Sequence, residues 1–343
     1  MNGAAETTRE VLLSLRDVTV SYPVSGGHAD ERVAVVRGVD LSLARGEILG
    51  LAGESGSGKT QLLLAILGLN GPHARLTGSI RYRDRELLGL PAAQLNGVRG
   101  ARIAMVFQDP ASALNPYLRI GEQLTEGLRT HDAAVSARQA RECACELLEA
   151  TQVSDPSRRL RQFPHELSGG MRQRVVIAMA LMTSPDILLA DEPTTALDVT
   201  VQAQILSLLA ALRERYGIAV LLVTHDLGVI AELADRVAVM YAGRIVEQAE
   251  VETLFRQPRH PYSEALRFCV PRLDAPLLTE LPTIPGAPPD PAQLPPGCAF
   301  APRCAYCMSV CRQRVPALRQ LSASHWSACH YEQPLTRWLD AQP

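Results

Sequence analysis

Short apolar runs alternate with segments of helical periodicity along residues 1–255 of the chain. Such runs predict strands, because consecutive apolar residues between helical segments are typical of the buried strands of a parallel sheet. The predicted strands are Val11–Leu15, Ile48–Ala52, Ile103–Phe107, Ile187–Ala190, Ala219–Val223 and Val237–Tyr241. Strands that alternate with helices in this way predict an α/β fold with a largely parallel sheet.

The pattern changes at two places along the chain. Between Asp109 and Pro185 it becomes mainly helical, and Ser136–Ala150 has apolar residues at helical spacing. We therefore expect a helical subdomain over about residues 109–185, inserted between two core strands. From Pro258 onward prolines are frequent, and proline interrupts long helices and central strands. The sequence thus predicts a first domain over residues 1–255 and an irregular, separately built module over residues 256–343.

A glycine-rich octapeptide follows the second predicted strand. Residues Gly53, Glu54, Ser55, Gly56, Ser57, Gly58, Lys59 and Thr60 fit the pattern G-x-x-x-x-G-K-[ST] of phosphate-binding loops. An apolar helical segment, Gln61–Leu69, comes next, so the strand and helix that the motif requires are both predicted. Glycines let backbone N–H groups face phosphates, Lys59 is expected to neutralise the β- and γ-phosphates, and Thr60 to bind Mg²⁺. The motif predicts a site for a nucleoside triphosphate, and the flanking elements argue against a chance Gly/Ser-rich turn.

Two carboxylates end the predicted strand 187–190. Asp191 stands at the strand tip, where it is placed to hold Mg²⁺ through water. Glu192 is placed to orient and deprotonate an attacking water molecule. A strand that simply ends in solvated acids is common, but beside a phosphate loop the catalytic interpretation is favoured.

Four single residues extend this candidate site. Gln108 leaves a predicted strand and is placed to touch Mg²⁺ or water and to sense the γ-phosphate. His225 lies just past another strand, at the sheet edge where α/β proteins bind ligands. Asp198 stands in the loop after the carboxylate pair, and Tyr22 is placed to stack on adenine.

A second anion-binding surface is predicted at Leu167–Gly170. Ser168, Gly169 and Gly170 precede an apolar helical segment, Val175–Met182, and form a helix start with exposed N–H groups. Alone, this segment would be an ordinary helix cap. Two anion cradles in one chain indicate that each serves a different nucleotide across a dimer.

Composition restricts the kinds of partner. The chain has 343 residues, 34 basic and 36 acidic side chains and a formal charge of −2, which argues against a nucleic-acid partner. No apolar run approaches the roughly 20 residues of a membrane-spanning helix. Residues 1–6 lack the basic and apolar regions of a signal peptide, so the chain alone is expected to be soluble and cytoplasmic.

Five of the eight cysteines lie between positions 298 and 329. In a reducing compartment such a group indicates a metal site more than disulfides. The pair Cys304 and Cys307 alone resembles half of a zinc site, which His325 and His330 are placed to complete. The residues themselves leave an iron–sulfur cluster, zinc and free thiols open.

The motifs at 53–60, Gln108, 167–170, Asp191-Glu192, 196–198 and His225 resemble, in order and spacing, those of the ATP-binding-cassette (ABC) ATPases, over about residues 11–255. The resemblance implies a P-loop ATPase core and a head-to-tail dimer, in which ATP lies between the phosphate loop of one cassette and the Leu-Ser-Gly-Gly segment of the other. By this resemblance Glu192, His225 and Gln108 are catalytic, and Thr60, Gln108 and Asp191 hold Mg²⁺. The implied ATP-binding residues are Tyr22, Gly53, Glu54, Ser55, Gly56, Ser57, Gly58, Lys59, Thr60, Gln61, Ser168, Gly169, Gly170 and Asp198.

Two segments within the cassette and three in the tail resemble the ATPase subunits of dipeptide and oligopeptide importers. They are Phe107–Pro110, Leu114–Tyr117, Pro258–Leu266, Ile284–Gly286 and Pro296–Cys304. This resemblance implies a subunit that powers peptide import from the cytoplasmic face of the cell membrane. The implied partners are a second, similar ATPase subunit in a heterodimer, two membrane permease subunits and, through the complex, an extracellular substrate-binding protein.

The tail of these importers resembles a four-cysteine [4Fe-4S] site, which implies Cys298, Cys304, Cys311 and Cys329 as ligands. A nickel or glutathione importer is the alternative within the class. From another class, a soluble ABC ATPase acting on ribosomes or DNA is disfavoured, because the chain carries one cassette and no sustained heptads.

Overall fold

The structure, a computed structural model, describes residues 9–24, 31–195, 197–270 and 283–335. The chain divides into two units, each described by itself below. The first comprises Met1–Leu15, Leu41–Glu47 and Ile80–Leu221, and the second Arg16–Asp40, Ile48–Ser79 and Leu222–Pro343. Strands β1 (Val11–Pro23), β2 (Arg32–Ala44), β4 (Arg75–Tyr82) and β8 (Ala219–Thr224) each contribute residues to both units.

A parallel strand pair forms the centre of the first unit. Strand β6 (Ile103–Val106) pairs with β7 (Ile187–Asp191), with Ile103 opposite Ile187 and Val106 opposite Ala190. Every residue of β7 is buried, which explains its continuous apolar sequence, since parallel strands are usually covered on both faces. The end of β4 pairs antiparallel with the two-residue β5 (Arg85–Glu86).

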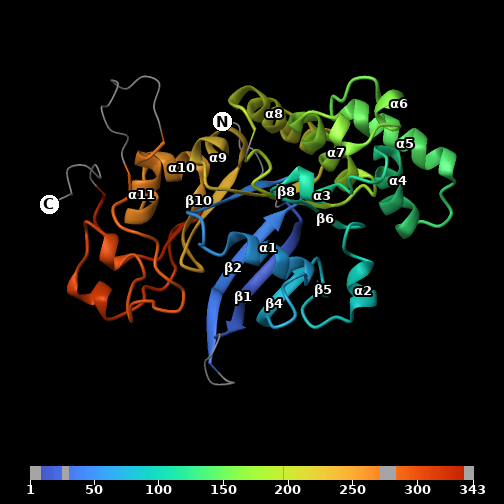
Figure 1. The fold of residues 1–343 in the computed structure, drawn as a ribbon. Coiled ribbons are helices and arrows are strands. Elements are labelled where there is room, and N and C mark those ends of the chain that lie inside the picture. The colour runs from blue at the N-terminus through green and yellow to red at the C-terminus, as the bar shows by residue number, and fades with distance from the viewer. Residues whose placement is uncertain (1–8, 25–30, 196, 271–282, 336–343) are drawn as a thin grey trace, which may run out of the picture. The chain divides into compact units, whose positions relative to one another are not determined.

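Helices make up most of the rest of the first unit, and the central ones pack together. Helices α4, α5 and α7 contact one another pairwise, and they form the green group in Figure 1. Helix α5 starts in a capping box, because Ser136 accepts the Gln139 N–H and the Gln139 side chain accepts the Ser136 N–H. The helices are α2 (Ala92–Asn96), α3 (Pro110–Ala113), α4 (Ile120–His131), α5 (Ala137–Ala150), α6 (Pro156–Arg159), α7 (Gly169–Leu181) and α8 (Val199–Tyr216), with one 3₁₀ turn at Pro164–Glu166.

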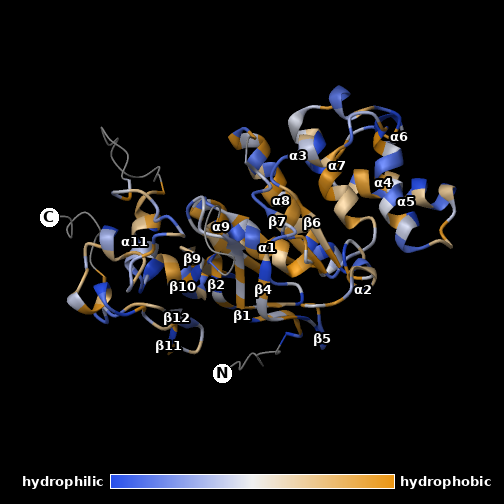
Figure 2. Ribbon diagram, turned by 60° about the horizontal axis from the view of Figure 1, so that its bottom comes forward, coloured by the Kyte–Doolittle hydropathy of each residue, from blue (hydrophilic) through white to orange (hydrophobic). Residues whose placement is uncertain are grey.

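Hydropathy explains why α7 lies inside this group. Figure 2 shows α7 largely in orange, as it does β6 and β7 of the same unit. Val175, Ile177 and Ala178 on α7 are fully buried. The helical content expected between residues 109 and 185 is therefore present, with α7 as its apolar centre.

In the second unit, the strands that lie wholly within it and pair in one sheet follow the order β11-β12-β10-β9-β3. Strand β3 (Ile48–Ala52) runs parallel to β9 (Arg236–Tyr241), and β10 (Arg244–Glu250) runs antiparallel to β9. The short strands β12 (His325–Ser327) and β11 (Arg319–Ser322) continue the sheet from β10. The helices are α1 (Lys59–Leu67), α9 (Leu227–Leu233), α10 (Val251–Arg256) and α11 (Pro261–Phe268), with 3₁₀ turns at Ala301–Arg303 and Ser309–Arg312.

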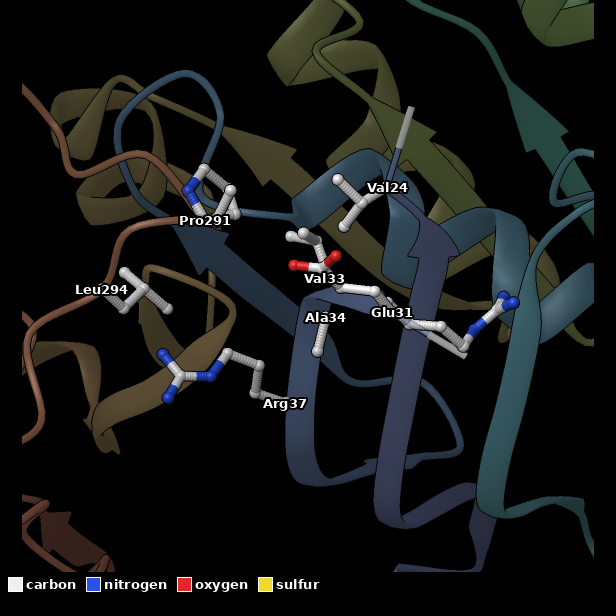
Figure 3. Close-up of a pocket in the computed structure, with 9 residues that line it drawn as sticks. Val24, Glu31, Val33, Ala34, Arg37, Pro291 and Leu294 are labelled. Atoms are coloured by element: carbon white, nitrogen blue, oxygen red, sulfur yellow. The ribbon is translucent and has the colours of Figure 1, made fainter. Parts of the chain in front are cut away.

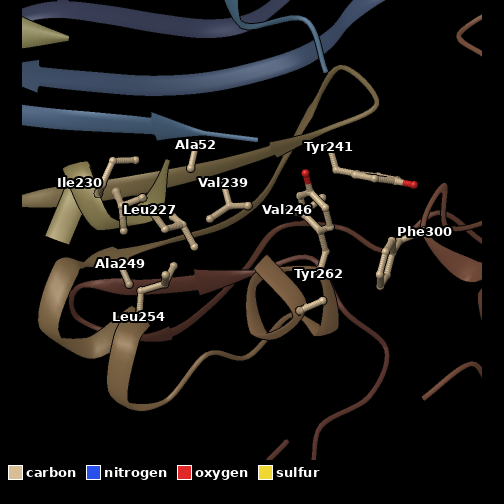
Figure 4. Close-up of a cluster of buried hydrophobic side chains, with 12 residues drawn as sticks. Ala52, Leu227, Ile230, Val239, Tyr241, Val246, Ala249, Leu254, Tyr262 and Phe300 are labelled. Atoms are coloured by element: carbon tan, nitrogen blue, oxygen red, sulfur yellow. The ribbon is translucent and has the colours of Figure 1, made fainter. Parts of the chain in front are cut away.

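Residues beyond position 255 share a hydrophobic core with β9 and β10 (Figure 4). The rings of Tyr241, Tyr262 and Phe300 lie within 4.5 to 5.3 Å of one another, centroid to centroid. The tail was expected to be separately built, but its described residues add strands and aromatic side chains to this unit. A proline-rich segment has too few apolar residues for a core of its own, so it shares one. The domain boundary at residue 255 stays a prediction.

No helix among the described residues is both long enough and apolar enough to cross a membrane.

Candidate nucleotide-binding site

The glycines at 53–58 are required by the backbone of the second unit. The loop joins β3 to α1, and Gly58 has a φ of 104°, which L side chains rarely adopt. A Cβ atom at Gly58 would lie 2.5 Å from the Val35 carbonyl oxygen, and one at Gly53 would lie 2.3 Å from the Met240 carbonyl oxygen. Neither contact is possible without moving backbone, so no other residue type fits at these positions.

Lys59 is the first residue of α1 and the only lysine in the chain. Its ammonium group donates to the carbonyl oxygens of Gly53, at 2.7 Å, and Glu54, at 3.0 Å, and the residue is only 5% exposed. The Gly243 N–H donates to the Ser57 carbonyl oxygen and supports the loop from outside. A single positive charge is thus held inside a curled, glycine-rich loop at a helix start, an arrangement suited to phosphate groups.

Tyr22 is tied to the helix that follows the loop. Its hydroxyl donates to the Gln61 side-chain oxygen at 2.6 Å, and the same oxygen accepts a hydrogen bond from Asn70. This contact fixes the Tyr22 ring at the end of β1, next to Gln61. Stacking of Tyr22 on adenine stays a prediction. Thr60 is exposed at the first turn of α1.

A cavity of about 220 Å³ opens in the same unit. Figure 3 shows Pro291 and Leu294 on one side of it and Val24 and Val33 on the other. The backbone N–H of Arg37, another lining residue, donates to the Gly243 carbonyl oxygen, and Gly243 in turn supports the phosphate loop. Burial and, to a smaller extent, the neighbouring Arg244 lower the pKa of Arg37.

His225 follows β8 and is exposed in the second unit. The next residue, Asp226, caps α9 by accepting the Gly228 N–H at 2.7 Å. His225 is thereby set in a fixed turn between a buried strand and a capped helix.

In the first unit the structure brings Gln108 and Glu192 together. The Gln108 amide nitrogen donates to the Glu192 carboxylate at 2.9 Å, and the Thr195 hydroxyl donates to the same oxygen at 2.9 Å. Glu192 has a φ of 46°, a strained conformation for a residue with a side chain. Asp191, one residue before, is buried at the end of β7. The sequence analysis missed Thr195, whose only signal is a hydroxyl three residues after a strand-terminal glutamate.

Ser168, Gly170 and Asp198 stand at helix starts of the first unit. The Ser168 hydroxyl accepts the Met171 N–H and caps α7, and Asp198 accepts the Val201 N–H and caps α8. A Cβ atom at Gly170 would lie 2.7 Å from a methyl group of Val201, so the two helix starts approach closely. Ala196, between them in sequence, lies outside the described residues.

None of the described cysteines of the tail forms a disulfide, and four of them line one small cavity in the second unit. Its lining includes Cys298, Cys304, Cys311 and Cys329, as well as His330. Burial raises the pKa of Cys304 to about 12 and that of Cys329 to about 11, so in this structure both are neutral. The Tyr331 backbone N–H donates to the Cys329 sulfur, which is the kind of hydrogen bond that stabilises a thiolate ligand.

The remaining candidate metal ligands do not line this cavity. The Cys307 sulfur contacts the Met308 carbonyl oxygen, and the His325 ring bonds to the buried carboxylate of Glu247 at 2.7 Å. Across the part of the chain that the structure describes, no three His, Cys, Asp or Glu side chains are arranged so that they could hold a metal ion.

The phosphate loop, Tyr22 and His225 therefore lie in the second unit, and Gln108, Asp191, Glu192 and the helix starts lie in the first. A glycine cradle that holds a lysine, together with a buried strand that ends in two carboxylates, defines a P-loop nucleotide-binding cassette.

Comparison with known proteins narrows this class. The sequence profile described as "ABC transporter" matches residues 36–195, and the profile described as "Oligopeptide/dipeptide transporter, C-terminal region" matches residues 246–311. The oligopeptide transport ATP-binding protein OppD of Salmonella typhimurium is 46% identical over 319 residues, which cover 93% of each chain. OppD of Mycobacterium bovis is 49% identical over 318 residues, and there the chain spans about half, 51%, of the relative's length.

Solved structures agree with this comparison. A dimeric, post-hydrolysis state of the ATP-binding cassette MJ0796, bound to ADP and Pi, has a TM-score of 0.62 and 31% sequence identity to this chain. The match covers 70% of this chain and 99% of that one. The chain belongs to the ABC transporter family, which confirms the resemblance drawn from its motifs.

Proposed function

We propose that the chain binds and hydrolyses ATP and that this hydrolysis drives transport across a membrane. The observation that carries the proposal is the phosphate loop, in which Lys59 is held by the carbonyl oxygens of Gly53 and Glu54 where no side chain fits at Gly53 or Gly58. Backbone N–H groups, the start of α1 and the Lys59 ammonium together would bind the β- and γ-phosphates.

The residues proposed for Mg²⁺ have suitable chemistry. Thr60 offers a hydroxyl, Asp191 a carboxylate and Gln108 an amide oxygen, and magnesium prefers such hard oxygen ligands. The Gln108 amide nitrogen bonds to Glu192, so its oxygen is the atom available for a cation. When bound, Mg²⁺ would neutralise charge on the β- and γ-phosphates.

Glu192 is the proposed general base. Gln108 and Thr195 both donate to one of its oxygens, which fixes the carboxylate in one orientation and supports a role in aligning water. His225 is proposed to contact the γ-phosphate. Ser168, Gly169, Gly170 and Asp198 are proposed to act on the nucleotide of a second cassette, as helix starts suit an anion.

Two substitutions test the ATPase proposal. Glu192→Gln should retain ATP binding and lose turnover, because an amide cannot accept the water proton. Lys59→Ala should weaken ATP binding itself. Glu214→Gln, in α8, serves as the matched control for the charge change. Turnover by Glu192→Gln at the rate of the unmodified chain would contradict the role of Glu192, and unchanged affinity in Lys59→Ala would contradict the role of the loop.

Peptides are the proposed cargo, and import is the proposed direction. Support comes from the C-terminal profile match and from relatives named for oligopeptide transport. The test is uptake by a complex in which this chain is assembled with the permease and substrate-binding subunits of a peptide importer. ATP-dependent uptake of peptides, without uptake of nickel or glutathione, is the expected result. Co-sedimentation with ribosomes instead of membranes would overturn the transport proposal.

The partners we propose are a second ATPase subunit, in a heterodimer, and two membrane permease subunits, at the cytoplasmic face of the membrane. Exposed apolar side chains near Gln108 in sequence support a contact with another protein. Phe107, Tyr117 and Leu118 are 43%, 87% and 38% exposed. A groove of about 500 Å³ along α4, lined by Leu118, Glu122 and Arg129 among others, continues this surface. Large exposed apolar side chains beside a groove suit a docked helix.

We also propose that Cys298, Cys304, Cys311 and Cys329 hold a [4Fe-4S] cluster. The four thiols line one cavity and Cys307 does not, which supports this set of ligands. The cavity, at about 10 Å³, has room for about one water molecule, so its walls must move apart around a cluster. Analysis of anaerobically purified protein for iron, sulfide and zinc is the test. About four irons and four sulfides per chain would support the cluster. Stoichiometric zinc without sulfide would replace it with a zinc site.

A further inference from the structure

Arg303, in the C-terminal tail, forms an ion pair with Glu54 in the phosphate loop. Its two terminal nitrogens donate to the two Glu54 carboxylate oxygens at 2.7 and 3.0 Å, a bidentate pair between residues 249 positions apart. The Arg303 side chain is 5% exposed and that of Glu54 is 25% exposed. A bidentate pair removed this far from water has a defined geometry, unlike an exposed ion pair.

All five N–H donors of Arg303 have acceptors. Besides Glu54 they are the Tyr241 hydroxyl at 3.3 Å, the Ile284 carbonyl oxygen at 3.3 Å and the Pro285 carbonyl oxygen at 2.8 Å. Burial alone would lower the pKa of Arg303, but hydrogen bonds to Glu54 and Tyr241 raise it. The guanidinium is therefore fixed in position as well as charged.

The backbone of Glu54 is held by the tail as well. Its N–H donates to the hydroxyl of Tyr262, on α11, at 2.8 Å. Tyr262 is fully buried in the aromatic group with Tyr241 and Phe300 that Figure 4 displays. Glu54 is thus held at its side chain by Arg303 and at its backbone by Tyr262.

Glu54 in turn holds the lysine of the site, because its carbonyl oxygen accepts a hydrogen bond from the Lys59 ammonium at 3.0 Å. A continuous set of contacts therefore joins Arg303 to Glu54 and Glu54 to Lys59. We propose that Arg303 is a positioning residue for ATP binding, which acts through Glu54 to hold the phosphate loop and Lys59 in the binding conformation. The proposal rests on the proposed ATPase function and extends the nucleotide site to the oligopeptide-transporter tail.

The structure also explains why the position of Arg303 is well defined. It ends the 3₁₀ turn Ala301–Arg303, and its N–H donates to the Phe300 carbonyl oxygen at 2.9 Å. Cys298 and Cys304, which line the cysteine cavity, flank this turn in sequence. The position of Arg303 therefore depends on the segment of the tail that also carries Cys298 and Cys304.

The test uses Arg303→Met, Glu54→Gln and the double variant of the full-length chain. Arg256→Met is the matched control, because Arg256 forms an exposed pair with Glu252 within α10. Each protein is assayed for its ATP dissociation constant and for the rate at which an amine-reactive reagent labels Lys59. Because Lys59 is the only lysine, peptide mass spectrometry separates its labelling from that of the N-terminus.

We expect Arg303→Met and Glu54→Gln each to raise the ATP dissociation constant about 10-fold, a coupling typical of residues that act through a contact network. Lys59 labelling should accelerate about 10-fold, since the ammonium is released from its carbonyl partners. The double variant should behave like either single variant. Arg303→Lys keeps the charge but not the bidentate fork, so it should show part of the loss.

Unchanged affinity and labelling in Arg303→Met would overturn the proposal, as would additive effects of the two substitutions. If Arg303→Met does not fold, Glu54→Gln decides alone, and its normal affinity and labelling would overturn the proposal. Labelling needs no nucleotide, so failure of the ATPase proposal is recognised separately, as a wild-type chain that binds no ATP.

Discussion

The amide nitrogen of Gln108 lies 2.9 Å from a carboxylate oxygen of Glu192, although the two residues are 84 positions apart. Gln108 follows β6 and Glu192 follows β7, and these strands are parallel neighbours. The carboxyl ends of parallel strands meet at one edge of a sheet, which is why the two side chains meet.

Gln108→Ala should lower the turnover number for ATP by about 10- to 100-fold, since it removes a group that orients Glu192 and a proposed Mg²⁺ ligand, and ATP affinity measured without Mg²⁺ should change little. Steady-state ATPase assays over a range of ATP concentrations provide the check. Gln94→Ala, an exposed glutamine that bonds to Arg85, is the control. A normal turnover number in Gln108→Ala would show that the contact has no part in catalysis.

Gly58→Ala should abolish ATP binding. The new methyl group would meet the Val35 carbonyl oxygen at 2.5 Å in a conformation that L residues rarely adopt, so the loop must distort. Equilibrium ATP binding measures the effect. Gly127→Ala is the control, because Gly127 lies in α4 with open space around it, and alanine there should be neutral or stabilising by up to about 1 kcal/mol. ATP affinity within twofold of wild type in Gly58→Ala would contradict the proposed geometry.

His260 should make folding stability depend on pH. It is fully enclosed and caps α11 by accepting the Tyr262 N–H, and burial lowers its pKa from 6.5 to about 3. The unfolded chain therefore binds a proton below pH 6.5 that the folded chain does not, and stability falls as the pH drops from 6.5 toward 3. By pH 4.5 the loss from this residue should reach about 2 to 3 kcal/mol.

Denaturant unfolding of His260→Asn at several pH values isolates that contribution. Asparagine keeps a helix-capping oxygen but does not titrate, so its stability should fall less on acidification. If the free energies of unfolding of the wild type and of His260→Asn fall by the same amount between pH 7 and pH 4.5, His260 is not the titrating group.

Tyr117→Ala should weaken assembly with the membrane subunits about 10-fold or more, as loss of an exposed aromatic anchor usually does at an interface. ATP binding by the isolated chain should not change, because the Tyr117 side chain is 87% exposed. Pull-down with the permease subunits measures assembly, and Tyr216→Ala, 40% exposed on α8, is the control. Equal recovery of both variants would place the membrane contact elsewhere.

The parallel strands could be predicted because burial on both faces leaves an uninterrupted apolar run. The six predicted strands all occur, and all but β1 match within one residue at each end. Strands β2, β4, β5, β10, β11 and β12 were not predicted. In β4 only Ile80 and Tyr82 are buried, so its sequence, Arg75–Tyr82, carries no such run.

The motifs located the phosphate loop, the carboxylate pair and the thiols, because each is a local pattern of residue types. The contacts around Glu54 could not be found in this way. Nothing in the sequence distinguishes Arg303 from the many other arginines, or Tyr262 from the other seven tyrosines. Only the folded chain brings these two residues to Glu54. Thr195 and the strained backbone of Glu192 were missed for the same reason.

The distance in sequence between Glu54 and Arg303 also bears on biosynthesis. Arg303 lies 249 positions after Glu54, and this stretch must be synthesised before the loop acquires its last contact. At about 5 to 20 residues per second this takes roughly 12 to 50 seconds. A nascent or truncated chain that lacks Arg303 would carry the complete glycine motif without the arginine proposed to position it, so we expect the loop to reach its full affinity for nucleotide only after Arg303 has been synthesised.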